Sequence, residues 1–119
     1  MRKVSKALLN ALLAHHRMVC RPAGNHLTDA NVRASVISYG ALCNAAGVPE
    51  LVQRVGPFLL EIAEWCDTHQ YPPLNSLAVN GTSLIPGDSY DGAGNFRMLN
   101  WPDDVRRCLT FHGYPGSVP

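Results

Sequence analysis

Charged side chains are scarce in this chain. Asp, Glu, Lys and Arg make up 16% of its 119 residues, whereas about 25% is usual for globular domains. Ten basic and nine acidic residues leave a net charge of +1, so any contact with nucleic acid or a membrane surface must be local. Apolar residues reach 46%. This composition indicates a face that a partner covers, which includes a second copy of the chain in a homodimer.

The chain also lacks a long apolar run and an export signal. A membrane-spanning helix needs about 18 consecutive apolar residues, and no such run is present. Arg2 and Lys3 precede the apolar ALLNALLA, but Asn10 interrupts it and no small-x-small cleavage site follows. The four cysteines are widely spaced. The sequence therefore predicts reduced thiols in a cytoplasmic protein with no membrane partner.

The length predicts a single domain over 1–119, because a chain of this size builds one core. Apolar residues at three- and four-residue spacing predict an amphipathic helix over 1–19. Asn100 is a good N-cap and predicts a C-terminal helix over 100–112. The residues rich in glycine and proline at 113–119 predict a mobile tail.

Residues between these two helices predict a helix-turn-helix. Ser38 is a good N-cap, because its hydroxyl can accept a hydrogen bond from a free N–H of the first turn. Gly47 can adopt the left-handed conformation that ends a helix. Pro49 suits the first position of the second helix, and a longer helix to about Gln70 follows.

The segment YPPLNSLAVNGTSLIPG predicts a β-hairpin. The alternation over 74–79 suits a strand, and Asn80-Gly81 favours a two-residue turn. Residues 82–85 can form the return strand, which Pro86-Gly87 ends. The expected fold is mainly α with a small β-hairpin (α+β), a winged-helix-like single domain whose core covers 36–91.

Part of the helix-turn-helix resembles a known DNA-binding unit. ISYGAL at 37–42, followed by AGVP at 46–49 and RVG at 54–56, is similar to the helix-turn-helix half of alkylguanine-DNA alkyltransferase-like proteins. That family carries a Pro-Cys-His-Arg site after its recognition helix, where this chain has IPGD at 85–88. The resemblance therefore does not imply alkyl transfer.

A broader resemblance covers about 36–91. SYGAL, VGPF, YPPL, LAVN and IPGDSY occur there in that order. Their spacing resembles a poorly characterised bacterial and phage winged-helix-like domain, found alone or beside HNH-type nucleases in defence systems and mobile elements. The resemblance implies nucleic-acid-associated biology and indicates no catalytic residue. The chain itself has no His-Asn-His grouping with the spacing of a nuclease site.

Two cysteine–histidine pairs are weak candidates for metal ligands. Cys66 and His69, and Cys108 and His112, are each about one helical turn apart, so each pair can present a thiolate and an imidazole on one face. The alternative is that both cysteines are small core residues and both histidines lie near the ends of helices. The chain has no CxxC motif, and we predict no metal and no cofactor.

Aspartates are the other candidates for chemistry. Asp88, Asp91, Asp103 and Asp104 lie in a glycine-rich loop and in the first turn of a helix, where aspartate more often serves turn formation and dipole compensation. No partner base stands at a readable spacing. We therefore predict no catalytic residue and a protein that is not an enzyme.

Nucleic-acid contacts are predicted on the second helix of the helix-turn-helix and at the tip of the hairpin. Glutamine and arginine side chains read adenine and guanine edges, and small polar residues donate to phosphates. The alternative is that these positions are ordinary solvated surface. The candidates are Gln53, Arg54, Asn80, Thr82, Ser83 and Arg33.

Two functions of different class follow. The first is a non-enzymatic nucleic-acid-binding module of a bacterial defence or mobile-element system, which the helix order and the resemblance favour. The second is a protein-interaction module, encoded by a phage or mobile element, that inhibits a host nucleic-acid-processing defence complex in the manner of an anti-CRISPR protein. Scarce charge and high apolar content favour the second.

Overall fold

The computed structural model describes residues 1–87, 90 and 100–119. It is mainly helical, with two short strands that pair in parallel, and so belongs to the α+β class. The elements in chain order are α1 (Lys3–Val19), α2 (Asp29–Ala34), β1 (Ile37–Ser38), α3 (Tyr39–Ala45), the 3₁₀ helix η1 (Pro49–Arg54), α4 (Gly56–Thr68), the 3₁₀ helix η2 (Leu74–Leu77), β2 (Ala78–Val79) and α5 (Trp101–Leu109).

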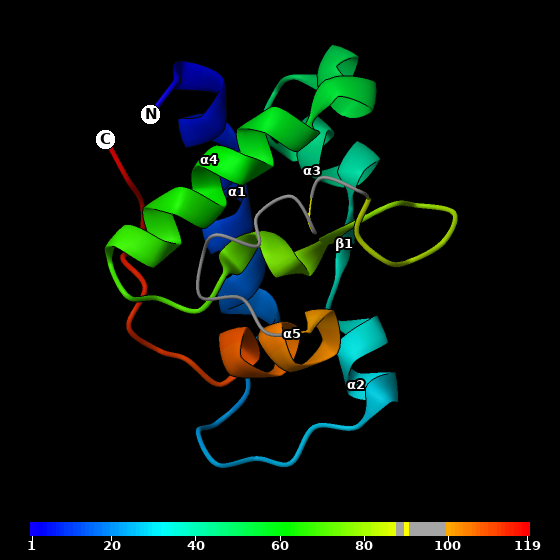
Figure 1. Cartoon of the computed structure of the whole chain (residues 1–119), viewed down its shortest axis with the longest axis vertical. Coiled ribbons are helices and arrows are strands. Elements are labelled where there is room, and N and C mark those ends of the chain that lie inside the picture. The colour runs from blue at the N-terminus through cyan, green and yellow to red at the C-terminus, as the bar shows by residue number, and fades with distance from the viewer. Residues whose placement is uncertain (88–89, 91–99) are drawn as a thin grey trace.

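Helix α1, which forms where the sequence predicts an amphipathic helix, is the centre of the core. Leu8, Leu9, Leu12 and Leu13 are at most 1% exposed, because their spacing places them on one stripe of the helix. α1 packs against α4, α3 and η2, and Figure 1 shows α4 lying across it. The other elements are therefore assembled around α1.

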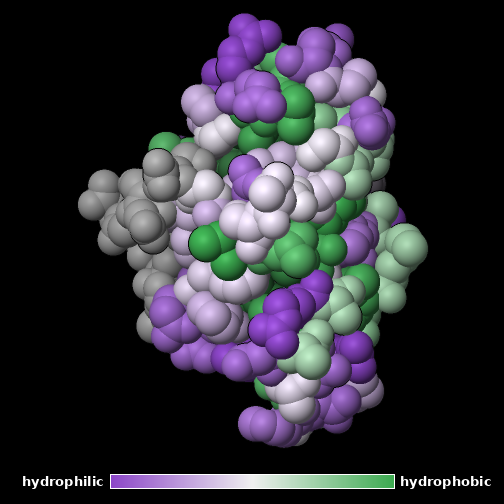
Figure 2. Space-filling model, turned by 90° about the vertical axis from the view of Figure 1, so that its right-hand side faces the viewer, coloured by the Kyte–Doolittle hydropathy of each residue, from purple (hydrophilic) through white to green (hydrophobic). Residues whose placement is uncertain are grey.

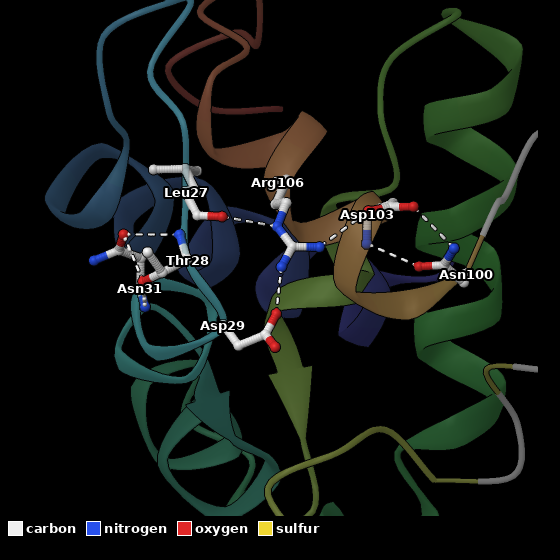
Figure 3. A network of polar contacts seen from close by, with 7 residues as sticks. All are labelled: Leu27, Thr28, Asp29, Asn31, Asn100, Asp103 and Arg106. Carbon is white, nitrogen blue, oxygen red and sulfur yellow. Dashed lines mark hydrogen bonds and ion pairs between the residues drawn. The ribbon is translucent and has the colours of Figure 1, made fainter.

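Helix α5 begins where the sequence predicts and ties two distant parts of the chain together. The Asn100 side chain accepts a hydrogen bond from the main-chain N–H of Asp103 at 3.1 Å. Arg106 donates to the main-chain oxygen of Leu27 at 3.0 Å, and its guanidinium also pairs with Asp103 at 3.0 Å and with Asp29 (Figure 3). One arginine thus joins α5 to the start of α2.

Helix α2 lies between the predicted N-terminal helix and the predicted winged-helix-like core, in a segment for which no element is predicted above. It begins with a capping box, in which the Thr28 hydroxyl accepts from the Asn31 main-chain N–H at 3.2 Å and Asn31 Oδ1 accepts from the Thr28 main-chain N–H at 3.0 Å. Val32 is its one buried residue. The cap and the tie to Arg106, rather than a wide apolar face, hold this short helix.

The predicted β-hairpin is wrong. Residues 74–77 form η2, and β2 pairs in parallel with β1, with Ile37 opposite Ala78. Residues 82–85 form turns and bends, not a return strand. The described residues therefore contain no hairpin wing. In addition, η1 takes the place of the second helix of the predicted helix-turn-helix and is a 3₁₀ helix of six residues.

Burial and side-chain hydrogen bonds explain this correction. Every residue over 73–79 is buried, so this segment crosses the core and has no solvated face of the kind a hairpin strand presents. Asn80 Oδ1 accepts from the main-chain N–H groups of Thr82 and Ser83, at 2.9 and 3.3 Å. This is an Asx turn. The positive φ that a hairpin turn requires occurs instead at Leu84, at 60°.

The C-terminal segment 113–119 is packed, although the sequence predicts a mobile tail there. Asn10 of α1 exchanges two hydrogen bonds with the main chain of Val118, at 2.8 and 3.1 Å. The Tyr114 hydroxyl donates to the main-chain oxygen of Pro72 at 2.6 Å. Asn10, the polar residue that interrupts the apolar run of α1, is therefore the anchor of the C-terminal segment.

Candidate nucleic-acid groove

A groove of about 570 Å³ lies between the start of α3, the end of η1 with the start of α4, and the loop after β2. We call it the polar groove, and its lining residues are 38–40, 52–57 and 80–82. The loop after β2 projects from the right side of the molecule in Figure 1, and Figure 2 looks onto that side. Apolar surface gathers there in the middle of the face, between hydrophilic ends.

The parallel strands bring the walls of the groove together. Because β1 ends where α3 begins and β2 ends where the loop begins, their pairing places residues 38–40 beside 80–82. The approach is close, since a Cβ added to Gly81 would lie 3.6 Å from the Cβ of Ser38. η1 and the first turn of α4 close the third side.

Four of the six predicted nucleic-acid residues line this groove: Gln53, Arg54, Asn80 and Thr82. Ser83 follows Thr82 in the loop and is exposed but does not line the groove. Arg33 lies on α2, outside the groove. The sequence predicts this arrangement from a recognition helix beside a hairpin wing, whereas the structure brings the residues together by the parallel strand pair and by the packing of η1 against α3.

Tyr39 holds the loop after β2 against the start of α3. Its hydroxyl accepts a hydrogen bond from the main-chain N–H of Gly87 at 2.6 Å. Burial raises the pKa of the Tyr39 hydroxyl, although the bond from Gly87 works against this rise. The hydroxyl therefore stays protonated at neutral pH. This contact joins the SYGAL and IPGDSY blocks, and sequence reasoning did not assign Tyr39 to the site.

Three polar side chains of the groove use an acceptor atom inside the protein. Ser38 Oγ accepts from the main-chain N–H of Ala41 at 3.1 Å, Tyr39 Oη accepts from Gly87, and Asn80 Oδ1 accepts from the loop. Their own protons, on two hydroxyls and an amide, have no acceptor among the described residues and can be donated to a ligand. The groove is therefore rich in hydrogen-bond donors.

The positive charge of the groove has no ion-pair partner among the described residues. Arg54 is exposed and makes no ion pair with any residue of the described chain. None of the described lining residues carries a carboxylate. A ligand with anionic or acceptor oxygens matches this lining.

The four candidate metal ligands do not form a metal centre in the described part of the chain. His69 and His112 each use one ring nitrogen on a main-chain oxygen, at 2.8 and 2.7 Å. Cys66 and Cys108 are buried, and burial raises the pKa of both thiols to about 12. A cysteine binds a metal ion as its thiolate, and a raised pKa disfavours the thiolate. Among the described residues, no three His, Cys, Asp or Glu side chains could hold a metal ion together.

A buried carboxylate lies in the first turn of α5, where the sequence predicts helix-dipole compensation, and it also makes two side-chain contacts. Asp104 is fully buried, accepts a hydrogen bond from the hydroxyl of Tyr90, and pairs with Arg107 at 2.6 Å. Burial, with the bond to Asp104, raises the pKa of Tyr90. The signal available in the sequence was the Asp-x-x-Arg spacing of 104 and 107. Asp88 and Asp91 lie outside the described residues.

A second cavity, of about 560 Å³, is lined by the chain start and the second half of α4. We call it the acidic cavity. Its Glu61 accepts from the Ser5 hydroxyl at 2.9 Å and from the main-chain N–H of Arg2 at 3.0 Å, and it pairs with the Arg2 side chain. Burial acts to raise the pKa of Glu61, but these bonds outweigh it and hold that pKa below its usual value. The lining residues are Met1, Arg2, Glu61, Glu64, Trp65, Thr68 and His69.

Comparison with known proteins found no matching family model, no matching curated protein and no matching solved structure. The two family resemblances therefore stay predictions. Within the described residues, no helix combines the length and the apolar character that a membrane crossing needs.

Proposed function

We propose that the protein is a non-enzymatic nucleic-acid-binding module whose binding site is the polar groove. The observation that carries this proposal is the lining: a single unpaired cation, donors whose acceptor atoms are already engaged, and no carboxylate among the described residues. Together with the two resemblances, this lining supports a role in a bacterial defence or mobile-element system.

Nucleic acid carries acceptor oxygens that can receive hydrogen bonds from the donors of this lining. Its phosphate oxygens are anionic, so Arg54 can neutralise one of them and release its counterion. The amide side chain of Gln53 suits base edges, because an amide both donates and accepts, whereas Asn80 offers its N–H donors, since its Oδ1 is bound within the loop. The net charge of +1 means that this local set, and not a general field, must carry the affinity.

The experiment is a fluorescence-anisotropy titration with a mixed pool of labelled oligonucleotides at several salt concentrations. We expect Arg54→Ala to weaken binding and to reduce the slope of log K against log salt by about one phosphate contact. The matched control is Lys6→Ala, which removes the same charge from an exposed position on α1. Binding that is absent at tens of micromolar, or that Lys6→Ala weakens equally, would contradict the proposal.

A second candidate function is the protein-interaction module that inhibits a host nucleic-acid-processing complex. The specific observation in its favour is the pair Leu84 and Ile85, which are 45% and 52% exposed in the loop beside the groove. Under this function, the double variant Leu84→Ser, Ile85→Ser abolishes capture of the partner. Under the first function, it leaves oligonucleotide affinity unchanged.

A further inference from the structure

We infer that the polar groove accepts a single-stranded segment of nucleic acid and not an intact duplex. This inference rests on the proposed function. It names the ligand class from the shape of the groove, its charge and the kind of donor that lines it.

The shape of the site is the first argument. A protein reads duplex DNA by inserting a protruding helix or two-stranded ribbon into the major groove. Here Gln53 and Arg54 belong to a 3₁₀ helix and line a concavity whose other walls are the start of α3 and the loop after β2. The described residues contain no hairpin that could enter a second groove. The ligand must therefore extend into the protein.

The size of the groove agrees with a ligand that extends into the protein. A volume of about 570 Å³ lies within the range of pockets that enclose small molecules, roughly 300 to 1,000 Å³. An unpaired nucleotide can enter such a space with its base and its phosphate, whereas a base inside a duplex is held in the stack and must first be extruded, at a cost of a few kcal/mol.

Charge is the second argument. Duplex binders neutralise several phosphates, commonly about six to ten. Arg54 is the cation among the described lining residues, so the groove can neutralise about one phosphate. A single strand offers binding energy beyond phosphate contacts, because its unstacked bases can stack and can form hydrogen bonds on their exposed edges.

The lining offers groups for an unstacked base. Tyr39 lines the groove and is half-buried, and its hydroxyl keeps a proton after accepting from Gly87. Gln53 and the amide of Asn80 lie on the same groove. These side chains can contact Watson–Crick edges, which are free in a single strand and occupied in a duplex.

The test compares one labelled 12-nucleotide DNA, the RNA of the same sequence, and the duplex that the DNA forms with its complement, at the same salt. We expect both single strands to bind at least about tenfold more tightly than the duplex, a difference worth a single stacked base. The DNA and RNA arms show whether the 2′-hydroxyl contributes. In the single-strand titration, Arg54→Ala should reduce the salt slope by about 0.7 while Lys6→Ala leaves it unchanged.

The outcomes separate this inference from the proposal beneath it. A duplex that binds as tightly as the single strand, or more tightly, overturns the inference and leaves nucleic-acid binding intact. If neither form binds at tens of micromolar, the proposed function fails and the inference fails with it. If single-strand binding is tight but its salt slope is the same in the Arg54→Ala variant and the wild type, the strand does not occupy this groove and the inference is wrong.

Discussion

Two cavities of nearly equal volume lie along α4 and have opposite chemistry. The polar groove, about 570 Å³, adjoins the start of the helix, and the acidic cavity, about 560 Å³, adjoins its second half. In the acidic cavity the charge of Glu61 is already matched by Arg2 and by the Ser5 hydroxyl, whereas Glu64 is exposed and makes no ion pair with any described residue. In the polar groove Arg54 has no partner among the described residues.

The walls of the two cavities also differ in the side chains that form them. Beside the acidic cavity, Trp65, His69 and Tyr71 form a packed aromatic cluster, with ring centroids 4.8 to 5.3 Å apart. The groove is lined instead by hydroxyl and amide groups whose protons have no acceptor in the described chain. Volume therefore does not distinguish a site from a structural hollow here. The distinguishing feature is the sign of the charge that has no ion-pair partner in the described chain, which is positive at Arg54 in the polar groove and negative at Glu64 in the acidic cavity.

The largest expected effect comes from reversing the charge of the groove. Arg54→Glu places a carboxylate against phosphate, and like-charge contact costs several kcal/mol, so we expect oligonucleotide affinity to fall by more than about tenfold. Anisotropy titration measures this loss. Lys6→Glu changes the net charge equally at an exposed site on α1 and should have little effect. Equal losses in the two variants would mean that binding follows net charge and not the groove.

A smaller effect is expected from the contact that holds the groove wall. Tyr39→Phe deletes the acceptor of the Gly87 N–H and should lower the free energy of unfolding by about 1 kcal/mol. Amide exchange over 80–87 should become faster, and oligonucleotide affinity should fall.

Tyr71→Phe is the matched control for this loop. Tyr71 belongs to the aromatic cluster beside the acidic cavity, and its hydroxyl makes no hydrogen bond within the described chain. The control should leave both exchange over 80–87 and binding as in the wild type. Unchanged loop exchange in Tyr39→Phe would show that Tyr39 does not hold the wall.

The smallest effect is expected in the acidic cavity and depends on pH. The pKa of Glu61 lies below its usual value of 4.5 in the folded protein, so ionised Glu61 stabilises the fold at pH values above 4.5. This stabilisation is lost as the pH falls through the lowered pKa. Glu61→Gln should therefore lower Tm near pH 7, with a cost of about 1 kcal/mol, and the difference from wild type should shrink below about pH 4.

Thermal unfolding by circular dichroism between pH 3 and pH 7 measures this dependence. Oligonucleotide affinity at pH 7 should be the same in Glu61→Gln and wild type. A loss of affinity in this variant would assign a binding role to the acidic cavity and contradict the assignment of binding to the polar groove alone.

The sequence predicts elements well where the signal is local. Ser38 caps α3 and Asn100 caps α5 as expected, and Gly47 has the predicted left-handed conformation at φ 77°, because each depends on a few neighbouring residues. Asn10 shows the limit of that reasoning. The sequence shows that Asn10 interrupts an apolar run, but its hydrogen-bond partner Val118 is 108 positions away.

The hairpin prediction is wrong because β2 pairs with a strand that is distant in the sequence. The segment 74–79 has alternation that also suits a half-buried strand, and nothing local reveals that β2 pairs with β1, about 40 positions earlier in the chain. The same pairing places Asn80 and Thr82 beside the start of α3, and η1, which packs against α3, adds Gln53 and Arg54 to the groove. These residues were predicted from side-chain chemistry, whereas Tyr39 and its bond to Gly87 depend on tertiary structure.

The central claim is that nucleic acid occupies the polar groove and leaves the acidic cavity free. The most direct measurement is amide hydrogen exchange of the whole protein with and without a saturating single-stranded 12-mer. With the 12-mer bound, we expect slower exchange over 38–40, 52–56 and 80–82 and unchanged exchange over 61–69. Protection confined to 61–69, or spread evenly over both regions, would contradict it.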